Sequence, residues 1–190
     1  MKRPYRHMPI LTFGDYMLRT IKRTDAIDMF DYGKDEEVTK FLSWGPFTDV
    51  SEAKHSIKDI FLPRLRQKLP IGYAIVDINK NKMIGTIDFH TKYQNGAEIG
   101  YVLHKDYWNK GIMTTALNLI IKIGFEHLNY EKITIKHLKS NIASQKVIEK
   151  TLFKKILSEP MIMKKWSGSI SDDLYIYELT KETYYGSKQS

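Results

Sequence analysis

Apolar residues in the first seventy positions recur mostly at helical spacing. Residues 15–23 alternate weakly and predict a first strand, after a lead-in with little pattern. Thr24 and Asp25 offer an N-cap for a short helix, and apolar residues three and four apart predict a second helix over 49–65. Pro63 falls inside that second pattern and is expected to kink or split the helix, because proline removes a backbone hydrogen bond.

From residue 71 onward the period shortens to two. Alternation over 71–78 and 83–90, with four polar residues between them, predicts a hairpin, and residues 97–103 predict the next strand. A regular apolar period of 3.6 residues then predicts a helix over 111–128. The middle of the chain is therefore expected to hold three consecutive strands and one amphipathic helix.

The last third of the chain repeats a strand–helix–strand order. Its expected segments are a strand at 132–138, a helix capped by Ser140 and Asn141, a short strand at 153–157, a polar loop at 158–173, a strand at 174–180 and a tail from 184. A loop of that length indicates either function or mobility. Because a hairpin-rich first half precedes a β-α-β-α-β order, we expect an α/β fold with a mixed sheet and helices on both faces. A single domain over 1–190, with its core at 15–183, accounts for the length.

The amino-acid composition says little about the fold but excludes several kinds of chemistry. The sequence has no cysteine, which excludes disulfides, thiolate metal sites and a cysteine nucleophile. The six histidines are scattered without ligand spacing, so no metal site is expected. No stretch approaches the roughly 18 apolar residues of a membrane span, and we expect a cytoplasmic protein without a membrane partner. The net charge of +8 favours an anionic partner, although lysines and arginines are spread in runs of at most two.

The start of the expected 111–128 helix has the features of an anion-binding site. Backbone amides at a helix N-terminus point at a bound pyrophosphate, the helix dipole favours the negative charge, and a glycine lets the backbone come close. The residues concerned are Asn109, Lys110, Gly111, Ile112, Met113 and Thr114. One glycine is too few for a Walker A loop or a dinucleotide fingerprint. A helix that simply tolerates a glycine at its start explains the stretch equally well.

Three polar side chains elsewhere are candidates for chemistry. Glu98 lies among apolar residues of the 97–103 strand, where partial desolvation would suit a general base; a salt-bridged glutamate is the alternative. Asn141 and Ser144, three residues apart at a helix start, share a face. Capping is the commoner role of such a pair, and hydrogen bonding to a ligand between the two helices is the other.

Three motifs in a fixed order carry a family resemblance. They are Ala-Glu-Ile-Gly-Tyr-Val-Leu at 97–103, Tyr-Trp-Asn-Lys-Gly-Ile-Met-Thr at 107–114 and Asn-Ile-Ala-Ser at 141–144. Together they resemble the GNAT acyltransferase superfamily, and within it the RimJ/RimL-like branch that acetylates protein N-terminal amines. The resemblance implies a largely antiparallel mixed sheet of six to seven strands. Its fourth strand (97–103) would splay from its fifth (132–138).

The same resemblance implies acetyl-coenzyme A as the acetyl donor. The pantetheine arm would lie between the splayed strands and pair with the backbone of Val102 and Leu103, with His104 just beyond. The pyrophosphate would sit on the amides of residues 109–114. Met113 replaces a residue that is often smaller in the family, so its side chain must point into the core.

The resemblance also implies direct transfer to an amine. Glu98 would take the proton of the amine, directly or through a water, and a backbone amide near Val102 would polarise the thioester carbonyl. Asn141 and Ser144 match positions that contact the pantetheine end and the thioester sulfur. The tyrosine that many members use as general acid would fall near Ile148, so that role is vacant or passes to Ser144.

The acceptor is expected to be a protein N-terminus. Alternatives are a small-molecule amine such as a polyamine, an amino acid or an antibiotic, and a non-catalytic acyl-coenzyme A sensor. A nucleic-acid partner is not expected, because lysines group only loosely over 132–155. Trp44 and Trp166, in expected loops, are candidates for lining the acceptor site of a monomer or homodimer. Acidic residues that could form a cleft for a polycation are Asp28, Asp31, Asp35, Glu36, Glu37, Asp172 and Asp173.

Overall fold

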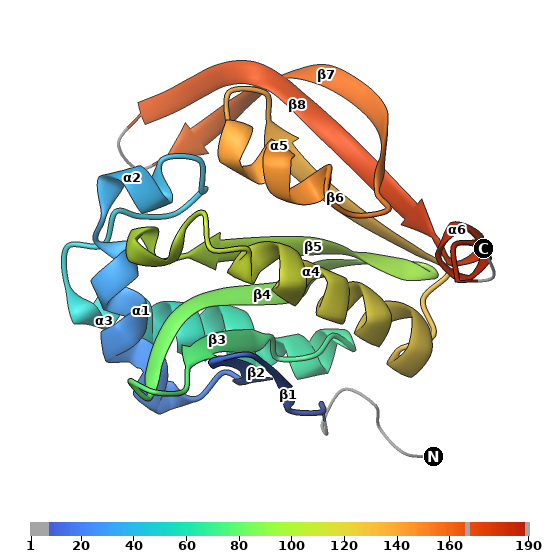
Figure 1. Ribbon diagram of the computed structural model, residues 1–190. Helices are drawn as coiled ribbons and strands as arrows, with labels where there is room; N and C mark the ends of the chain where they lie inside the picture. Colours follow the sequence, from blue (N-terminus) through green and yellow to red (C-terminus); the bar gives the residue numbers. More distant parts are fainter. Residues whose placement is uncertain (1–7, 166–167, 189–190) are drawn as a thin grey trace.

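An eight-stranded sheet forms the centre of the described part of the molecule (Figure 1). The computed structural model describes residues 8–165 and 168–188. The strands are β1 Leu11–Phe13, β2 Tyr16–Thr20, β3 Tyr73–Asp77, β4 Lys82–Tyr93, β5 Gly96–Leu103, β6 Lys132–Leu138, β7 Lys154–Lys165 and β8 Gly168–Thr180. Their order in space is β1-β2-β3-β4-β5-β6-β8-β7, and each neighbouring pair is antiparallel except β5 with β6. The expected mixed, largely antiparallel sheet is confirmed.

Helices cover both faces of this sheet, as expected (Figure 1). The α-helices are α1 Ala26–Gly33, α2 Glu36–Thr39, α3 Val50–His55, α4 Ile112–Lys122, α5 Ile142–Ile148 and α6 Lys181–Gly186. Tighter or wider helical turns adjoin them at η1 Arg23–Asp25, η2 Ser56–Phe61, η3 Leu62–Gln67, η4 Lys105–Tyr107 and η5 Ile123–His127. Leu117 and Ile120 of α4 pack into the core on one face, and Met29 of α1 and Ala53 of α3 pack into the core on the other.

Strand β5 separates the two cores because its side chains alternate. Ile99 and Leu103 lie in the core beneath α4, whereas Val102 lies in the core beneath α1 and α3. A strand period of two therefore places Glu98 and Gly100 on the α1–α3 face. The carboxylate thus lies on the face of the sheet opposite to the one that α4 covers.

The junction of β5 and β6 is where the sheet opens. Pairing begins with Gly96 opposite Lys132 and ends with Ile99 opposite Ile135. Beyond that point residues 100–103 and 136–138 have no ladder partner across the junction in the described chain, so the two strands diverge (Figure 1). These strands correspond to the expected fourth and fifth strands, and the expected splay between them is confirmed.

The expected number of six to seven strands was too low, because β1 was not predicted; the strands expected at 153–157 and 174–180 are present as β7 and β8 but are longer. β1 lies in the lead-in and pairs with β2, and residues 158–173 belong to a long hairpin of β7 and β8 instead of a loop. β7 is the edge strand and most of its residues are exposed. An exposed edge strand needs no alternation of apolar and polar residues, so its sequence resembles a loop.

Several boundaries also differ from the sequence-based ones. Pro63 does split the second helix, which continues beyond α3 as η2 and η3. β4 extends to Tyr93, three residues beyond the strand predicted over 83–90, and α5 ends at Ile148. The expected tail from 184 begins inside α6, where Tyr184 is buried against Phe125. No helix in the described residues is long and apolar enough to cross a membrane.

Candidate active site

The start of α4 presents backbone amides that the helix itself does not use. The first hydrogen bond into the helix runs from Thr115 N to Gly111 O at 3.1 Å, so the amides of Ile112, Met113 and Thr114 have no carbonyl one turn earlier. Gly111 is the N-cap with φ +74°, and Asn109 also has a positive φ of 61°. A Cβ built on Gly111 would meet nothing within 4 Å, which leaves the space before these amides open. We refer to residues 109–114 as the amide cradle.

The side chains of the amide cradle point away from this open space. Ile112 and Met113 are buried in the core beneath α4. The size of Met113 is therefore absorbed by the core and does not crowd the amides. Lys110 Nζ lies 5.2 Å from the ring centre of Tyr107 and adds a cation beside the cradle.

The backbone of β5 divides its hydrogen bonds between β4 and the gap. His104 N donates to Ile84 O at 2.7 Å. In an antiparallel pair the backbone groups of alternate residues bond to the same neighbouring strand, so the backbone groups of Val102, two residues before His104, also bond to β4. The backbone groups of Tyr101 and Leu103 consequently face the gap. The expectation that Val102 offers its backbone to a ligand was therefore wrong: the β4 ladder already uses those groups.

Two further residues at the end of β5 are held by local bonds. Trp108 Nε1 donates to Leu103 O at 2.7 Å, which occupies that carbonyl and leaves the Leu103 amide facing the gap. His104 is buried, its Nδ1 accepts from Asp106 N at 3.2 Å, and its Nε2 lies 3.4 Å from Asp31 of α1. The imidazole of His104 thus fixes the corner between β5 and α4.

Asn141 and Ser144 lie at the start of α5. Asn141 caps the helix, because its Oδ1 accepts from Ser144 N at 3.1 Å. The Ser144 hydroxyl lies 2.7 Å from the Tyr101 hydroxyl, which comes from β5. Burial raises the pKa of Tyr101, so this hydroxyl stays protonated at neutral pH. A tyrosine from a strand, which sequence reasoning missed, therefore contacts the serine that the motif singled out.

Glu98 is buried on the α1–α3 face and has several partners. Its Oε2 accepts from the Tyr93 hydroxyl at 2.7 Å and lies 2.9 Å from Lys136 Nζ, while its Oε1 lies 3.5 Å from His90 Nε2. Thr134 in turn donates to the Tyr93 hydroxyl at 3.1 Å. We refer to these five residues, from β4, β5 and β6, as the Glu98 cluster.

Charge in the Glu98 cluster is balanced by pairing. Burial lowers the pKa of Lys136, but the hydrogen bond to Glu98 and the attraction of nearby negative charges together outweigh burial, and the net shift is upward. Burial also raises the pKa of the Tyr93 hydroxyl, which remains a donor. The cluster is thus compatible with both interpretations of Glu98. Oε2 is bonded to Tyr93 and Lys136, as in a salt bridge, whereas Oε1 faces the partly exposed His90 and can accept a proton.

The expected acceptor region is bounded by α2 and the β7–β8 hairpin. Trp44 stacks on Phe47 with ring centres 4.9 Å apart and packs against the core beneath α1 and α3. Trp166 lies outside the described residues. Lys165 Nζ donates to Thr39 O at 2.7 Å and Lys40 O at 3.1 Å, so the hairpin reaches the end of α2.

Most of the acidic residues in this region are already paired. Lys82 Nζ lies 2.6 Å from Asp31, Lys105 Nζ lies 2.5 Å from Asp35, and Lys139 Nζ lies 3.3 Å from Asp173. Asp28 accepts from Met83 N and Asp172 from Ser140 N, both at 2.9 Å. Glu36 and Glu37 remain exposed. Of these seven acidic residues, three are thus paired with lysines of this chain, two accept from backbone amides and two remain exposed.

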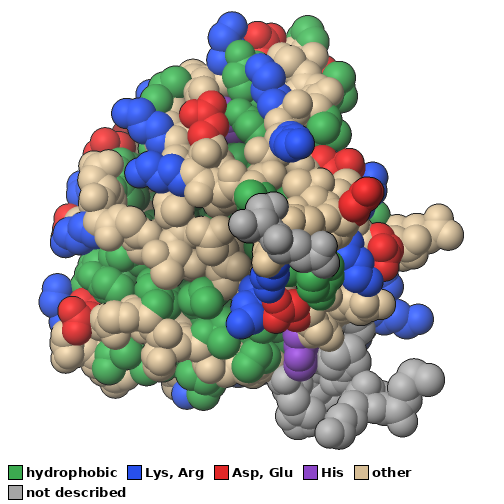
Figure 2. Space-filling model, turned by 45° about the vertical axis from the view of Figure 1, so that its right-hand side comes forward, with side chains coloured by type: hydrophobic (Ala, Val, Ile, Leu, Met, Phe, Trp, Pro, Cys, Tyr) green, Lys and Arg blue, Asp and Glu red, His purple; other side chains and the backbone are tan. Residues whose placement is uncertain are grey.

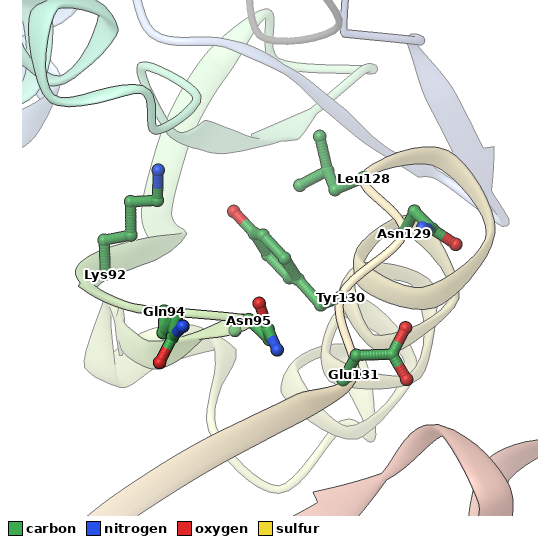
Figure 3. Close-up of a pocket in the computed structure, with 8 residues that line it drawn as sticks. Lys92, Gln94, Asn95, Leu128, Asn129, Tyr130 and Glu131 are labelled. Atoms are coloured by element: carbon green, nitrogen blue, oxygen red, sulfur yellow. The ribbon is translucent and has the colours of Figure 1, made fainter.

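Two surface features lie apart from these residues. A pocket of about 480 Å³ opens at the other end of β5 (Figure 3). Its lining residues are Lys92, Gln94, Asn95, Gly96, Leu128, Asn129, Tyr130 and Glu131, and none of them was a site candidate. On the face shown in Figure 2, lysine and arginine side chains are interspersed with aspartate and glutamate instead of forming one basic block.

Comparison with known proteins identifies the family. Residues 16–154 match the family described as the acetyltransferase (GNAT) domain. The chain is 33% identical over 176 residues to the uncharacterized N-acetyltransferase p20 of Bacillus licheniformis, covering 89% of this chain and 94% of the relative. It is 28% identical over 149 residues to the uncharacterized N-acetyltransferase YoaA of Bacillus subtilis, covering 77% and 84%. The chain therefore belongs to the GNAT acetyltransferase family and is an acyltransferase.

Solved structures share the whole fold. RimL, described as a ribosomal L7/L12 alpha-N-protein acetyltransferase in complex with coenzyme A, has a TM-score of 0.79 at 19% identity over 90% of this chain and 98% of its own. A ribosomal-protein-S5-alanine acetyltransferase from Vibrio fischeri has a TM-score of 0.74 at 22% identity over 92% and 98%. At these identities the likeness establishes the fold, which in this family binds acetyl-coenzyme A and serves an amine acceptor.

Proposed function

We propose that this protein transfers an acetyl group from acetyl-coenzyme A to the N-terminal α-amine of a protein. One observation carries the proposal: the gap between β5 and β6 has the amide cradle at its mouth and Glu98 on the opposite face of the sheet. A donor can thus reach the gap from the α4 side while an amine approaches from the α1–α3 side.

The chain's own groups fit such a donor. The open amide cradle, with Lys110 beside it, suits a pyrophosphate. The amides of Tyr101 and Leu103 face the gap and can pair with an amide-containing arm. The Asn141 cap places Ser144 beside Tyr101 at the same gap. Acetyl-coenzyme A supplies an activated thioester when it is bound there.

The catalytic roles follow from the two sides of the gap. Glu98 Oε1, the less committed carboxylate oxygen, accepts the proton of the attacking amine, while a gap-facing amide of β5 polarises the carbonyl. The new bond joins the amine nitrogen to the acetyl carbon, and the carbon–sulfur bond breaks. Ser144 Oγ, held by the Tyr101 hydroxyl at 2.7 Å, donates a hydrogen bond to the leaving sulfur, which departs as a thiolate and takes its proton from water.

A protein N-terminus suits this site better than a polycation. Asp31 at α1 and Asp35 at the start of α2 are paired with lysines of the same chain, which leaves mainly the exposed Glu36 and Glu37 for a polyamine. An α-amine has a pKa of about 7.7–8.0, below the value of about 10.4 for a lysine-type amine, so a modest base is enough to deprotonate it near pH 7. The alternatives, a small-molecule amine and a non-catalytic acyl-coenzyme A sensor, are outcomes of the test below.

The test combines binding with turnover. We expect acetyl-coenzyme A to raise the melting temperature, and we expect thiol release when peptides with a free N-terminus are added but not with the same peptides pre-acetylated. Glu98→Gln should lower kcat by roughly 10²–10⁴-fold, as expected for loss of a general base, and should keep the thermal shift. Glu178→Gln is the matched control, because Glu178 pairs with Lys132 on the outer part of the sheet.

Each contrary outcome points to a different alternative. Thiol release with spermidine, free amino acids or aminoglycosides but not peptides would make the acceptor a small amine. A thermal shift without thiol release for any amine would indicate a sensor. No stabilisation by acetyl-coenzyme A would contradict the proposal as a whole.

A further inference from the structure

A β-bulge on β4 places an additional histidine beside Glu98. The register between β4 and β5 pairs Phe89 with Ile99 and then Thr91 with Glu98, so His90 is the extra residue. Bulges re-aim side chains and recur next to active sites. A Cβ built on Gly100 would come within 2.8 Å of the His90 ring, so the absence of a side chain at Gly100 makes room for the imidazole.

The imidazole of His90 connects the buried carboxylate to solvent. Its Nε2 lies 3.5 Å from Glu98 Oε1, and its Nδ1 lies 2.8 Å from the hydroxyl of Thr91. The side chain of His90 is 36% exposed, whereas that of Glu98 is 11% exposed. The other carboxylate oxygen, Oε2, is occupied by Tyr93 and Lys136. Oε1 therefore has His90 as its route to water among the described side chains.

We propose that His90 is a positioning residue that relays the amine's proton from Glu98 to solvent. The inference rests on the proposed function, because it assigns the exit of the proton that Glu98 accepts. Imidazole changes its charge near neutral pH, which suits a relay of this kind.

The proton transfer balances through two steps. With the Nδ1 hydrogen donated to Thr91, the Nε2 lone pair faces Glu98 Oε1. Once Glu98 has taken a proton from the amine, that proton passes from Oε1 to Nε2 and forms an imidazolium. The exposed imidazolium then releases one proton to water, and both the neutral ring and the carboxylate are regenerated for the next cycle.

The charges that face His90 come from each neighbouring element. Glu98 on β5 and Asp88 on β4 are negative, and Arg64 of η3 pairs with Asp88. Burial raises the pKa of Asp88, and Arg64 and His90 both lower it, which places His90 within electrostatic reach of that carboxylate. Lys136 and Tyr93 complete the surroundings through Glu98.

The test is a comparison of His90→Gln with His127→Gln. Glutamine keeps hydrogen bonding at position 90 but cannot carry the proton, and His127 is an exposed histidine of η5 outside the site. We expect His90→Gln to lower kcat at least about tenfold, below the roughly 10²–10⁴-fold of a direct base, with an unchanged KM for acetyl-coenzyme A. Rising imidazole concentration in the buffer should restore part of kcat in His90→Gln and leave the wild type and His127→Gln unchanged.

Two results would overturn the relay. Either an unchanged kcat in His90→Gln, or a reduced kcat with no response to imidazole and a wild-type pH profile, would limit His90 to a structural role. Failure of the proposed function is seen separately. If the wild type binds acetyl-coenzyme A without any turnover, or if Glu98→Gln retains full activity, the general-base assignment itself is wrong.

Discussion

The two sides of the β5–β6 gap differ in the groups that form them: backbone amides on one side and side chains on the other. The amide cradle consists of backbone amides from six consecutive residues, and its buried side chains belong to the core. The Glu98 cluster consists of side chains from three strands, held by hydrogen bonds and ion pairs of 2.7–3.5 Å. One side depends on local conformation and the other on long-range pairing. Mutations should therefore affect cofactor binding at the first and stability or proton transfer at the second.

Replacement of Gly111 should separate backbone geometry from binding. Gly111→Val places a β-branched residue at φ +74°, with an expected cost of about 1–2 kcal/mol in the free energy of unfolding. The same side chain would stand before the open amides, and we expect affinity for acetyl-coenzyme A to fall about tenfold or more. Calorimetric titration and urea unfolding measure the two effects.

Gly14→Val is the matched control for that variant. Gly14 also has a positive φ of 55° and open space around its Cβ position, but it lies in the β1–β2 turn. It should lose similar stability and keep its affinity. Equal affinities in the two variants would mean that the amide cradle does not hold the donor.

Removal of Lys136 tests the Glu98 cluster. Lys136→Met leaves a buried carboxylate without its cation, and we expect the free energy of unfolding to fall by about 1–3 kcal/mol. Lys132→Met, four residues earlier on β6, removes an exposed pair with Glu178 and should cost less than about 1 kcal/mol. Urea denaturation of both variants, and of Glu98→Gln alone and combined with Lys136→Met, also gives the coupling energy between Lys136 and Glu98. Equal losses for the two lysines would remove the distinction between the cluster and an ordinary surface pair.

Tyr101→Phe tests the leaving-group end of the gap. The variant removes the hydroxyl that lies 2.7 Å from Ser144 Oγ, and we expect kcat to fall about tenfold, the effect of losing one hydrogen bond that orients Ser144 toward the leaving sulfur. Because the phenyl ring remains, the affinity for acetyl-coenzyme A should stay close to that of the wild type. A stopped-flow or steady-state thiol assay measures the change. A wild-type kcat would leave Ser144 to act without the tyrosine.

The smallest effect is expected at Asp31, between α1 and the corner at His104. Its hydrogen bond to Lys82 lowers the pKa of Asp31 to about 2, partly opposed by burial. Since this value lies below the ordinary 3.8, the stabilisation is present above about pH 4 and is lost as pH falls toward 2. Asp31→Asn should therefore cost less than about 1 kcal/mol at pH 7 and nothing near pH 2, because the pair is partly exposed. Urea unfolding of the wild type and Asp31→Asn between pH 7 and pH 2 measures this. A difference in the free energy of unfolding that grows as the pH falls would contradict the prediction.

Sequence reasoning succeeded wherever the signal was local. Alternation located β3 to β6, and the 3.6-residue period located α4 with its glycine start, because those elements contribute regularly spaced apolar side chains to a core. Sequence reasoning failed for most of β7 and for the first half of β8, because a largely exposed edge hairpin has no buried face that apolar residues would mark. It also assigned the gap-facing backbone to Val102, since which residues bond to β4 depends on register.

The amino-acid sequence by itself determined the amide cradle and the presence of a carboxylate on β5. Both are properties of one continuous segment, governed by backbone conformation and side-chain period. Only the tertiary structure decided which side chains contact that carboxylate. Tyr93, Lys136 and His90 reach Glu98 because β4 carries a bulge and β6 runs parallel to β5. Contacts between strands far apart in the chain follow from register and packing, and no local pattern encodes them.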